Sequence, residues 1–428
     1  MLDLRFIRDH VEEVRAGAEA KGITVDLQKI IEFDDRRRTL ILEGDTLKAK
    51  RNQISAQVGK IKREGGDASA VIAEMDSVKK RLQEIEPETR EVETALNDLL
   101  LTVPNIPHSS VPIGKTPADN KEVFRWGEIP NPDFPLKPHW ELTDKLGIID
   151  FNRGSKVSGA GFPFYVGKGA ALERALINFF LDQAAERGYT ELAAPIVVNE
   201  DSARGTGQIP DKEDLMYIVE RDKFYMIPTA EVPVTNFHRD EIIPEEQLPI
   251  RYAAYTPCFR REAGSYGKDV RGLNRLHQFD KVELVKFVHP SASYEELESL
   301  REDAEHLLKL LKIPYHRLLM CTGDMGFTQA KKYDLEVWAP GQQKWLEVSS
   351  CSNFESFQAR RMNIRFRPQN TAAGKSAAPK PEILHTLNGS GLALPRIVAA
   401  IIEQYQTPEG KIIIPKILHP YTKFEVIG

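Results

Sequence analysis

The chain has 428 residues, of which 41% are hydrophobic and 28% charged, a composition typical of a soluble protein with two or three folded domains. Its formal net charge of -5 excludes a protein that attracts nucleic acid through overall charge, so such a contact would need a local basic patch. Its three cysteines, Cys258, Cys321 and Cys351, form no CxxC pair, which argues against a zinc finger or disulfide framework and for reduced thiols in a cytosolic protein.

The N-terminal stretch, MLDLRFIRDHVEEVR, carries acidic residues from its third position and has no apolar core of signal-peptide length. No run elsewhere approaches 18 apolar residues, so we expect no membrane span. Together these features predict a cytoplasmic protein with no membrane partner.

Residues 27–103 follow a heptad-like pattern in two runs. The steps between apolar positions alternate between four and three residues, which is the seam of a coiled coil. The sequence EGGD at 64–67 separates the runs and predicts a turn, so the two helices should fold back antiparallel. A helix of about 37 residues reaches roughly 55 Å. The predicted seam positions are Phe33, Arg37, Leu40, Gly44, Leu47, Arg51, Ile54, Val58 and Ile61, followed by Val71, Met75, Val78, Leu82, Ile85, Thr89, Val92, Leu96 and Leu99.

Two features mark this hairpin. Pro87 lies inside the second run and should kink the helix or interrupt its hydrogen bonds. The stretch from Leu47 to Arg63 contains cations and no acid, which fits either a solvated helix face or a basic tip for a phosphate backbone. Those cations are Lys48, Lys50, Arg51, Lys60, Lys62 and Arg63.

The heptads stop after PNIPHSSVP at 104–112, and the proline-rich residues 109–150 are predicted to be a linker to a second domain. From 151 onward, helices are expected at about 169–188, 291–312 and 393–405. Several strand-like runs follow one another without a crossover helix, so the sheet should be largely antiparallel. The predicted strands are 190–198 (with Pro195), 223–234, 250–262, 276–288, 333–340 and 344–350.

A short stretch at 259–287 concentrates unusual chemistry. If YTPCFRREA and HQFDKVELVKF are paired strands, Arg260 and Glu262 share one face, as do Phe279, Lys281 and Glu283, because alternate side chains of a strand point the same way. A guanidinium can bind phosphate, an aromatic ring can stack on a purine, and a carboxylate can hold an ammonium group. A surface hairpin with cross-strand ion pairs explains any one of these residues, but it explains the whole set less well.

The usual nucleotide and metal motifs are absent. The GKS at 374–376 lacks the first glycine of a Walker motif, since position 369 is Gln. GAGFPF, GTGQIP and GSGLAL each lack the third glycine of a dinucleotide fingerprint, and no HEXXH occurs. An ATP site in this chain would therefore need another architecture.

The sequence FRRE resembles the FRxE signature of class II aminoacyl-tRNA synthetases, and FRREAGSYGKDVRGLNRLHQFDKVEL resembles its form in the seryl-tRNA synthetase family. In chain order, ELAAPIVV resembles motif 1, PTAEVPV the serine-binding loop, LEVSSCSN the metal and ATP strand, and HTLNGSGLALPR motif 3. The heptad hairpin is similar to the tRNA-binding arm of the family. At Lys268 the family often has Arg. The resemblance covers essentially the whole chain.

The resemblance implies an α+β fold. Residues 1–108 would be a tRNA-binding domain with a coiled-coil arm, and residues 109–428 a class II catalytic domain with a mostly antiparallel sheet flanked by helices. The implied reaction attaches L-serine to tRNA(Ser), and also to tRNA(Sec), through a seryl-adenylate, with ATP and Mg²⁺ and without structural zinc. The family uses the arm on the long variable arm of its tRNA. Motif 1, around residues 183–198, implies a homodimer.

The resemblance also assigns roles residue by residue. Arg260 and Arg396 are expected to be catalytic, Arg260 at the α-phosphate and Arg396, with Arg275, at the outer phosphates. The implied serine site comprises Thr229, Ala230, Glu231, Glu283, Asn388 and Ser390. The implied ATP site comprises Arg260, Arg261, Glu262, Arg275, Phe279, Glu347, Val348, Ser349, Ser350 and Arg396, with Glu347 and Ser350 as Mg²⁺ ligands. The six cations of 47–63 would bind tRNA.

Three details depend on local geometry. In a regular strand Glu347 shares a face with Ser349, so either the strand ends at Ser349 or a bulge turns Ser350 inward; the sequence leaves both open. Thr229 and Glu231 are expected on one strand face, where they would meet the α-ammonium of serine. A carboxylate buried in a strand, as at Glu283, needs a cationic or donor partner.

Three other functions would each account for part of the sequence. A structural coiled-coil protein accounts for 27–103 but for nothing after 151. A paralogue that loads an amino acid onto a carrier protein usually lacks the arm and uses zinc, whereas this chain has the arm and no clustered Cys/His set. An inactive regulatory paralogue is disfavoured by the intact arginines and glutamates. Serine-dependent ATP–pyrophosphate exchange discriminates among them.

Overall fold

A computed structural model describes residues 1–262, 271–369 and 379–428. Lys268 and the GKS sequence lie outside these ranges. The chain divides into two compact units, one comprising Leu2–Glu19 and Ile23–Pro104 and the other comprising Met1, Ala20–Gly22 and Asn105–Gly428. None of the helices in the described ranges combines the length and apolarity that a membrane span requires.

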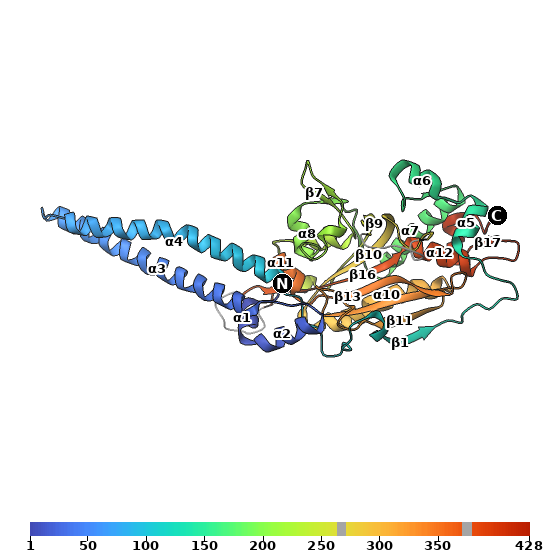
Figure 1. The fold of residues 1–428 in the computed structure, drawn as a ribbon, viewed down its shortest axis with the longest axis horizontal. Helices are drawn as coiled ribbons and strands as arrows, with labels where there is room; N and C mark the ends of the chain where they lie inside the picture. The colour runs from blue at the N-terminus through green and yellow to red at the C-terminus, as the bar shows by residue number, and fades with distance from the viewer. Residues whose placement is uncertain (263–270, 370–378) are drawn as a thin grey trace. The chain divides into compact units, whose positions relative to one another are not determined.

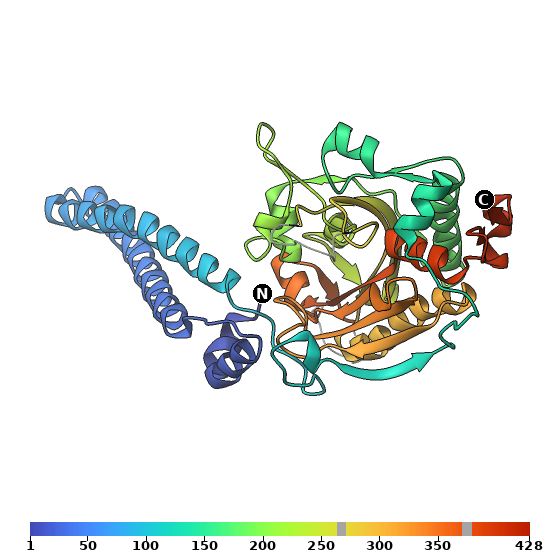
Figure 2. The ribbon, with the colours of Figure 1, turned by 45° about the vertical axis from the view of Figure 1, so that its right-hand side comes forward.

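The first unit is dominated by a helical hairpin. Helices α3 (Leu27–Arg63) and α4 (Ser69–Leu101) run back along each other, and Figure 2 shows the same pair from another direction. Two short helices, α1 (Leu4–Asp9) and α2 (Val11–Ala20), precede the hairpin. The predicted seam is the buried or half-buried stripe of both helices, except that Arg51 is exposed. The stripes of the two helices pack against each other, as expected for an antiparallel coiled coil.

Pro87 does not end its helix, because α4 continues on both sides of it. The proline removes one backbone donor, and the next turn adds a side-chain bond in which Thr89 Oγ1 donates to the Ile85 carbonyl over 2.8 Å. Across the hairpin, Arg81 forms a forked ion pair with Glu43 at 2.7 and 3.0 Å.

The second unit contains an eight-stranded sheet with the strand order β1-β11-β12-β13-β16-β10-β9-β4. All neighbouring pairs are antiparallel except β4 with β9, which confirms the predicted α+β class with a largely antiparallel sheet. The strands are β1 (Lys121–Trp126), β4 (Thr190–Glu191), β9 (Ile250–Phe259), β10 (Gln278–Val288), β11 (Tyr315–Leu319), β12 (Lys331–Ala339), β13 (Lys344–Asn353) and β16 (His385–Ala393).

The two faces of this sheet differ. Val282 and Leu284 of β10 belong to the main apolar core together with α7 (Lys168–Glu186), α10 (Ser293–Leu310) and α12 (Leu394–Gln404). Because side chains alternate along a strand, Lys281 and Glu283 point to the opposite face. That opposite face carries the candidate site, and Figure 1 shows the strands that form it.

Smaller elements surround the sheet. Short pairings are formed by β2 with β3, by β5, β6 and β7, by β8, β14 and β15, and by β17 with β18. Their bounds are β2 (Ile149–Asp150), β3 (Phe164–Tyr165), β5 (Val197–Val198), β6 (Ile218–Val219), β7 (Phe224–Met226), β8 (Ile242–Pro244), β14 (Arg365–Arg367), β15 (Glu382–Ile383), β17 (Ile412–Ile413) and β18 (Val426–Ile427). The remaining helices are α5 (His139–Leu146), α6 (Phe151–Ser158), α8 (Glu200–Thr206), α9 (Glu231–Thr235), α11 (Phe357–Arg361) and α13 (His419–Thr422).

Three predictions about elements were wrong. Residues 109–150 are not a linker, since β1 forms one edge of the main sheet and α5 packs within the same unit. The strand expected at 190–198 is two short strands, β4 and β5, with Pro195 between them, because proline cannot donate to a ladder. The strand expected at 223–234 ends at Met226, and Glu231 begins the helix α9.

Candidate active site

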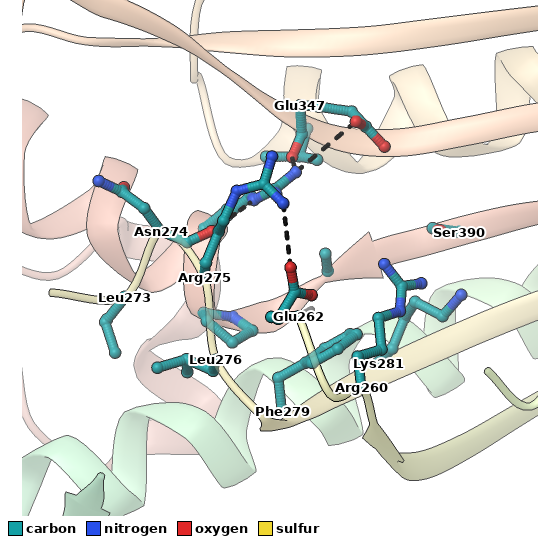
Figure 3. Close-up of a pocket in the computed structure, with 14 residues that line it drawn as sticks. Arg260, Glu262, Leu273, Asn274, Arg275, Leu276, Phe279, Lys281, Glu347 and Ser390 are labelled. Atoms are coloured by element: carbon teal, nitrogen blue, oxygen red, sulfur yellow. Dashed lines mark hydrogen bonds and ion pairs between the residues drawn. The ribbon is translucent and has the colours of Figure 1, made fainter. Parts of the chain in front are cut away.

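An open cleft lies on the face of the sheet opposite the helical core. Its walls come from the start of β10, from β13 and β16, from the residues that follow β9, from the start of α12 and from the segments 208–216, 228–231 and 273–276. The wider part of the cleft has a volume of about 370 Å³. Figure 3 shows its narrower part, in which Arg260 lies beside Phe279 and Arg275 extends toward Glu262 from another segment.

Arg260 and Phe279 form one corner of the cleft. β9 ends at Phe259 rather than at the predicted residue 262, so Arg260 leaves the strand and its Nε donates to the Pro228 carbonyl over 3.3 Å. Its guanidinium carbon lies 5.0 Å from the centre of the Phe279 ring, a cation–π contact. Arg260 thus stays at the cleft with most of its donors available for an anion.

Arg275 and Arg396 approach from two other segments. Arg275 Nη1 donates to Glu262 Oε2 over 2.9 Å, while Arg396 donates to the Glu347 carbonyl over 2.6 Å and to the Asn274 carbonyl over 3.2 Å. Arg396 is in the first turn of α12, where the helix dipole also favours an anion. Three guanidinium groups therefore line one cleft, in a chain whose overall charge is negative.

Glu283 is fully buried behind the lining of the cleft, in contact with Thr229 and Asn388, which do line it. Lys281 forms an ion pair with its Oε2, Thr229 donates to the same oxygen over 3.2 Å, and Asn388 Nδ2 donates to Oε1 over 2.9 Å. Lys281 also donates to Thr229 Oγ1 over 2.8 Å. The required cationic partner of Glu283 is thus Lys281, a role that was not assigned from the sequence although the two residues share a strand face.

Glu231 is the second buried carboxyl of this corner. It starts helix α9 instead of sharing a strand face with Thr229, but the turn still brings both residues to Glu283. Asn388 Nδ2 donates to Glu231 Oε2 over 3.0 Å, and Gln358 Nε2 donates to Oε1 over 2.6 Å. Burial, reinforced by the nearby Glu283, raises the pKa of Glu231 to about 7. A cationic ligand at this point would favour the ionised form.

A β-bulge decides the question of Glu347 and Ser350. In the ladder of β12 with β13, Leu335 pairs with Ser349 and Glu336 pairs with Glu347, so Val348 is the extra residue. The strand continues to Asn353, and Glu347 and Ser350 both line the cleft. Ser349 instead turns away, and its Oγ donates to the Ser390 carbonyl over 2.7 Å.

The carboxyl groups around this bulge differ in charge. Burial opposes ionisation of Glu347, but Arg396 and Lys332 outweigh that effect and lower its pKa. Burial raises the pKa of the neighbouring Asp334 to about 7, against the lowering effect of Lys332, whose ammonium lies 3.1 Å away. An ionised Glu347 beside the Ser350 hydroxyl is a pair of hard oxygen donors, the ligands that Mg²⁺ prefers.

The structure brings most of the predicted residues together but not all. Arg261 is not among the residues that line the cleft, and its Nη1 donates to the Asp214 carbonyl over 3.0 Å. Ala230 and Ser349 are buried behind the lining. The residues that line the cleft and were not predicted include Lys212, Lys281, Lys332 and Gln329. Their positions are scattered along the sequence and form no motif that would predict a site. Lys281 is the exception, because it shares a predicted strand face with Glu283.

The six predicted tRNA-binding cations lie on α3, near its end at Arg63. Lys50 pairs with Glu74 of α4 at 2.7 Å, and Lys48 pairs with Asp45 at 3.5 Å. All six are exposed. Exposed ion pairs of this kind contribute little to stability, so they leave the side chains ready to exchange partners.

Comparison with known proteins first gives the class. Residues 217–405 match the family description "tRNA synthetase class II core domain (G, H, P, S and T)", and residues 1–107 match "Seryl-tRNA synthetase N-terminal domain".

The full-length relatives then give the family. The serine--tRNA ligase of Salinibacter ruber is 57% identical, with 100% of this chain and 99% of the relative aligned. That of Chloroherpeton thalassium is 53% identical, with 100% of both chains aligned. The crystal structure of seryl-tRNA synthetase from Pyrococcus horikoshii complexed with ATP has a TM-score of 0.91 at 37% identity, covering 100% of this chain and 99% of the other. The chain belongs to the seryl-tRNA synthetase family.

Proposed function

We propose that this chain is a serine--tRNA ligase that uses ATP to attach L-serine to tRNA(Ser) through a seryl-adenylate. The observation that carries the proposal is the single cleft in which three arginines and Phe279 adjoin a buried polar corner of Thr229, Glu231, Glu283 and Asn388. The arginines suit a polyphosphate, and the corner suits a small molecule with an ammonium and a hydroxyl. The names of the full-length relatives support the same assignment.

In the first step, a carboxylate oxygen of serine bonds to the α-phosphorus of ATP, and the bond to the β-phosphate breaks to release pyrophosphate. Arg260 stabilises the charge that develops on the α-phosphate, while Arg275 and Arg396 hold the outer phosphates. Phe279 stacks on the adenine, and Glu262 contacts the adenine side. The protein mainly positions the groups, since the chemistry lies in the substrates.

The serine ammonium is held by Glu231 and Thr229, and its hydroxyl by Glu283 and Ser390. Glu283 and Ser390 face each other in the ladder of β10 with β16, so the two groups share one place on the sheet. A site that bonds a hydroxyl rejects an analogue without it by roughly 10⁴ or more. We therefore expect alanine, which lacks the hydroxyl, to be rejected.

Glu347 and Ser350 would hold Mg²⁺ against the phosphates, and the bulge at Val348 is the feature that gives them a common side. When bound, the ion would neutralise phosphate charge. Val348 and Arg396 complete that wall of the cleft.

In the second step the terminal ribose hydroxyl of tRNA bonds to the seryl carbonyl carbon, and the mixed anhydride bond breaks to release AMP. We infer a division of labour in which residues 1–108 capture tRNA through the six cations of α3 and residues 109–428 perform the chemistry. Serylation of tRNA(Sec) would use the same arm. Such a function belongs in the cytoplasm, where tRNA is charged.

We also propose a homodimer formed through the motif 1 region, residues 183–198. Ile196 and Val197 are exposed apolar side chains at 38% and 41%, which a two-fold interface would cover. Sedimentation at micromolar concentration should give a dimer. A fully active monomer would contradict this part of the proposal.

Serine-dependent exchange of radiolabelled pyrophosphate into ATP tests the catalytic proposal directly. The purified chain should support exchange with L-serine and not with alanine or threonine. A chain that bound ATP but showed no serine-dependent exchange would refute it.

A further inference from the structure

A buried histidine lies behind the wall of the cleft and outside the residues discussed so far. His139 is the first residue of α5 and is 0% exposed. Its Nδ1 lies 2.8 Å from Glu403 Oε1 of α12, and its Nε2 lies 2.8 Å from the backbone nitrogen of Leu273. Leu273 begins the segment 273–276, which lines the narrower part of the cleft, as Figure 3 shows.

The contacts fix the tautomer of this ring. The Leu273 backbone nitrogen can only donate, so His139 Nε2 must be the unprotonated acceptor. Nδ1 therefore carries the proton and donates it to Glu403. The Glu403 carboxylate thus stabilises the tautomer with the proton on Nδ1. In that tautomer Nε2 is free to accept a hydrogen bond from the cleft wall.

Glu403 is fully buried, and its carboxylate accepts hydrogen bonds from N–H groups of several segments. It accepts hydrogen bonds from the backbone and the ring of His139, from the backbone of Gly341, and from the backbone and side chain of Gln342. Gln342 Oε1 in turn accepts from Asn274 Nδ2 over 2.8 Å. One carboxylate thus reaches two consecutive residues of the cleft wall, Leu273 through His139 and Asn274 through Gln342.

Two further contacts show that the segment fits closely against α5. A Cβ atom built on Gly272, whose φ is +65°, would lie 2.2 Å from His139 Nε2, so only glycine allows the approach. The guanidinium carbon of Arg271 lies 5.4 Å from the centre of the Trp140 ring. Residues 271–274 are therefore each held from outside the cleft.

We propose that His139, kept in one tautomer by Glu403, is a positioning residue that fixes the segment 271–276 and thereby places Arg275 and Asn274 for the nucleotide. Asn274 matters because its carbonyl accepts from Arg396, so the segment orients two of the three arginines of the cleft. The inference rests on the proposed function for its catalytic consequence, but not for its structural one.

Two substitutions of His139 separate the acceptor from the rest of the ring. In His139→Gln, an amide oxygen replaces Nε2 and can still accept from Leu273. In His139→Asn, the side chain reaches only the position of Nδ1, which leaves the buried Leu273 N–H without a partner. We expect His139→Asn to raise the dissociation constant of ATP by about tenfold to a hundredfold and His139→Gln to raise it by less than about threefold.

Three readouts distinguish positioning from general destabilisation. Calorimetric titration of the full chain with ATP measures the dissociation constant. Hydrogen exchange of the peptide containing 271–276, without ligand, should be faster in His139→Asn and nearly unchanged in His139→Gln. In the exchange assay the KM for ATP should rise while the KM for serine stays the same.

His316 offers a matched control in the same unit. Its nitrogens lie 2.9 Å from Glu122 and 2.7 Å from Glu336, and its ring stacks on Trp345, so it is also a buried histidine bound to carboxylates. His316→Asn should leave the affinity for ATP and the hydrogen exchange of 271–276 unchanged. Equal behaviour of His139→Asn and His139→Gln, or an equal loss in His316→Asn, would overturn the proposal. A wild-type chain that binds ATP but shows no serine-dependent pyrophosphate exchange would refute the proposed function. The hydrogen-exchange measurement on 271–276 would still test the positioning role of His139.

Discussion

The hairpin of α3 and α4 and the cleft on the sheet use charge in opposite ways. On the hairpin the six cations of 47–63 are exposed to water, so each contributes a weak, screened attraction and only their sum matters. In the cleft Glu283 is fully buried and Glu231 nearly so, and each hydrogen bond to them has a definite geometry. The hairpin should tolerate single changes, whereas the cleft should not.

The two regions also differ in what holds them together. The hairpin repeats one kind of local contact along two helices, and α4 continues on both sides of Pro87. The cleft depends on contacts between residues far apart in the chain, such as Arg396 with Asn274 and His139 with Leu273. The following predictions test this contrast, from the largest expected effect to the smallest.

Arg260→Ala should lower serine-dependent pyrophosphate exchange by roughly a thousandfold or more, because a preorganised charge on the α-phosphate is worth several kcal/mol in the transition state. The neighbouring Arg261→Ala is the matched control, since Arg261 is not among the residues that line the cleft, and it should retain most of the exchange rate. Circular dichroism should show that both variants fold. Near-normal exchange by Arg260→Ala would remove it from the mechanism.

Replacing Lys48, Lys50, Arg51, Lys60, Lys62 and Arg63 together with Gln should raise the KM for tRNA by roughly ten- to a hundredfold and flatten its salt dependence. Pyrophosphate exchange should survive, because no cleft residue changes. Aminoacylation at several salt concentrations measures the effect.

The control for this experiment replaces Lys29 and Arg90, which are exposed cations of the same hairpin outside the run. If pyrophosphate exchange fell together with tRNA charging in the six-cation variant, the hairpin would instead support the catalytic unit. If neither rate fell in that variant, the basic run would be a solvated helix face.

The affinity for serine should increase as pH rises through about 7. Burial and Glu283 raise the pKa of Glu231 to about 7, so below that pH Glu231 is largely protonated and must lose its proton to hold the ammonium. In the range well below pH 7, the KM for serine should fall by up to about tenfold for each unit by which the pH is raised. Glu231→Gln should weaken binding and abolish this dependence. A dependence that persisted in Glu231→Gln would point to Asp334, whose pKa is also about 7.

Pro87→Ala should have the smallest effect on activity and a clear effect on the hairpin. It restores a backbone donor in the exposed middle of α4, which should stabilise the helix by roughly 1–3 kcal/mol. Hydrogen exchange of peptides from 83–91 should slow, with exchange of pyrophosphate unchanged. A loss of charging in this variant would mean that the proline sets a shape that tRNA binding needs.

Prediction from sequence succeeded where one segment carries its own pattern. The heptad positions of α3 and α4 became the buried stripe, and the pairing of β9 with β10 placed Phe279, Lys281 and Glu283 on the face that forms the cleft. It failed where a neighbour overrides the local pattern. Residues 190–198 and 223–234 look like strands, but Pro195 and the turn into α9 break them.

By itself, the sequence determined the class, the hairpin and a set of candidate site residues of which most line the cleft, because periodicity and long ordered motifs are properties of the chain. Only the tertiary structure decided that a bulge at Val348 turns Ser350 beside Glu347, that Lys281 neutralises Glu283, and that Arg261 lies outside the cleft. It also joined His139 to Leu273 across 134 positions of sequence. Such contacts depend on register and on burial, and these are set when distant segments pack together, not by the residues of any one segment.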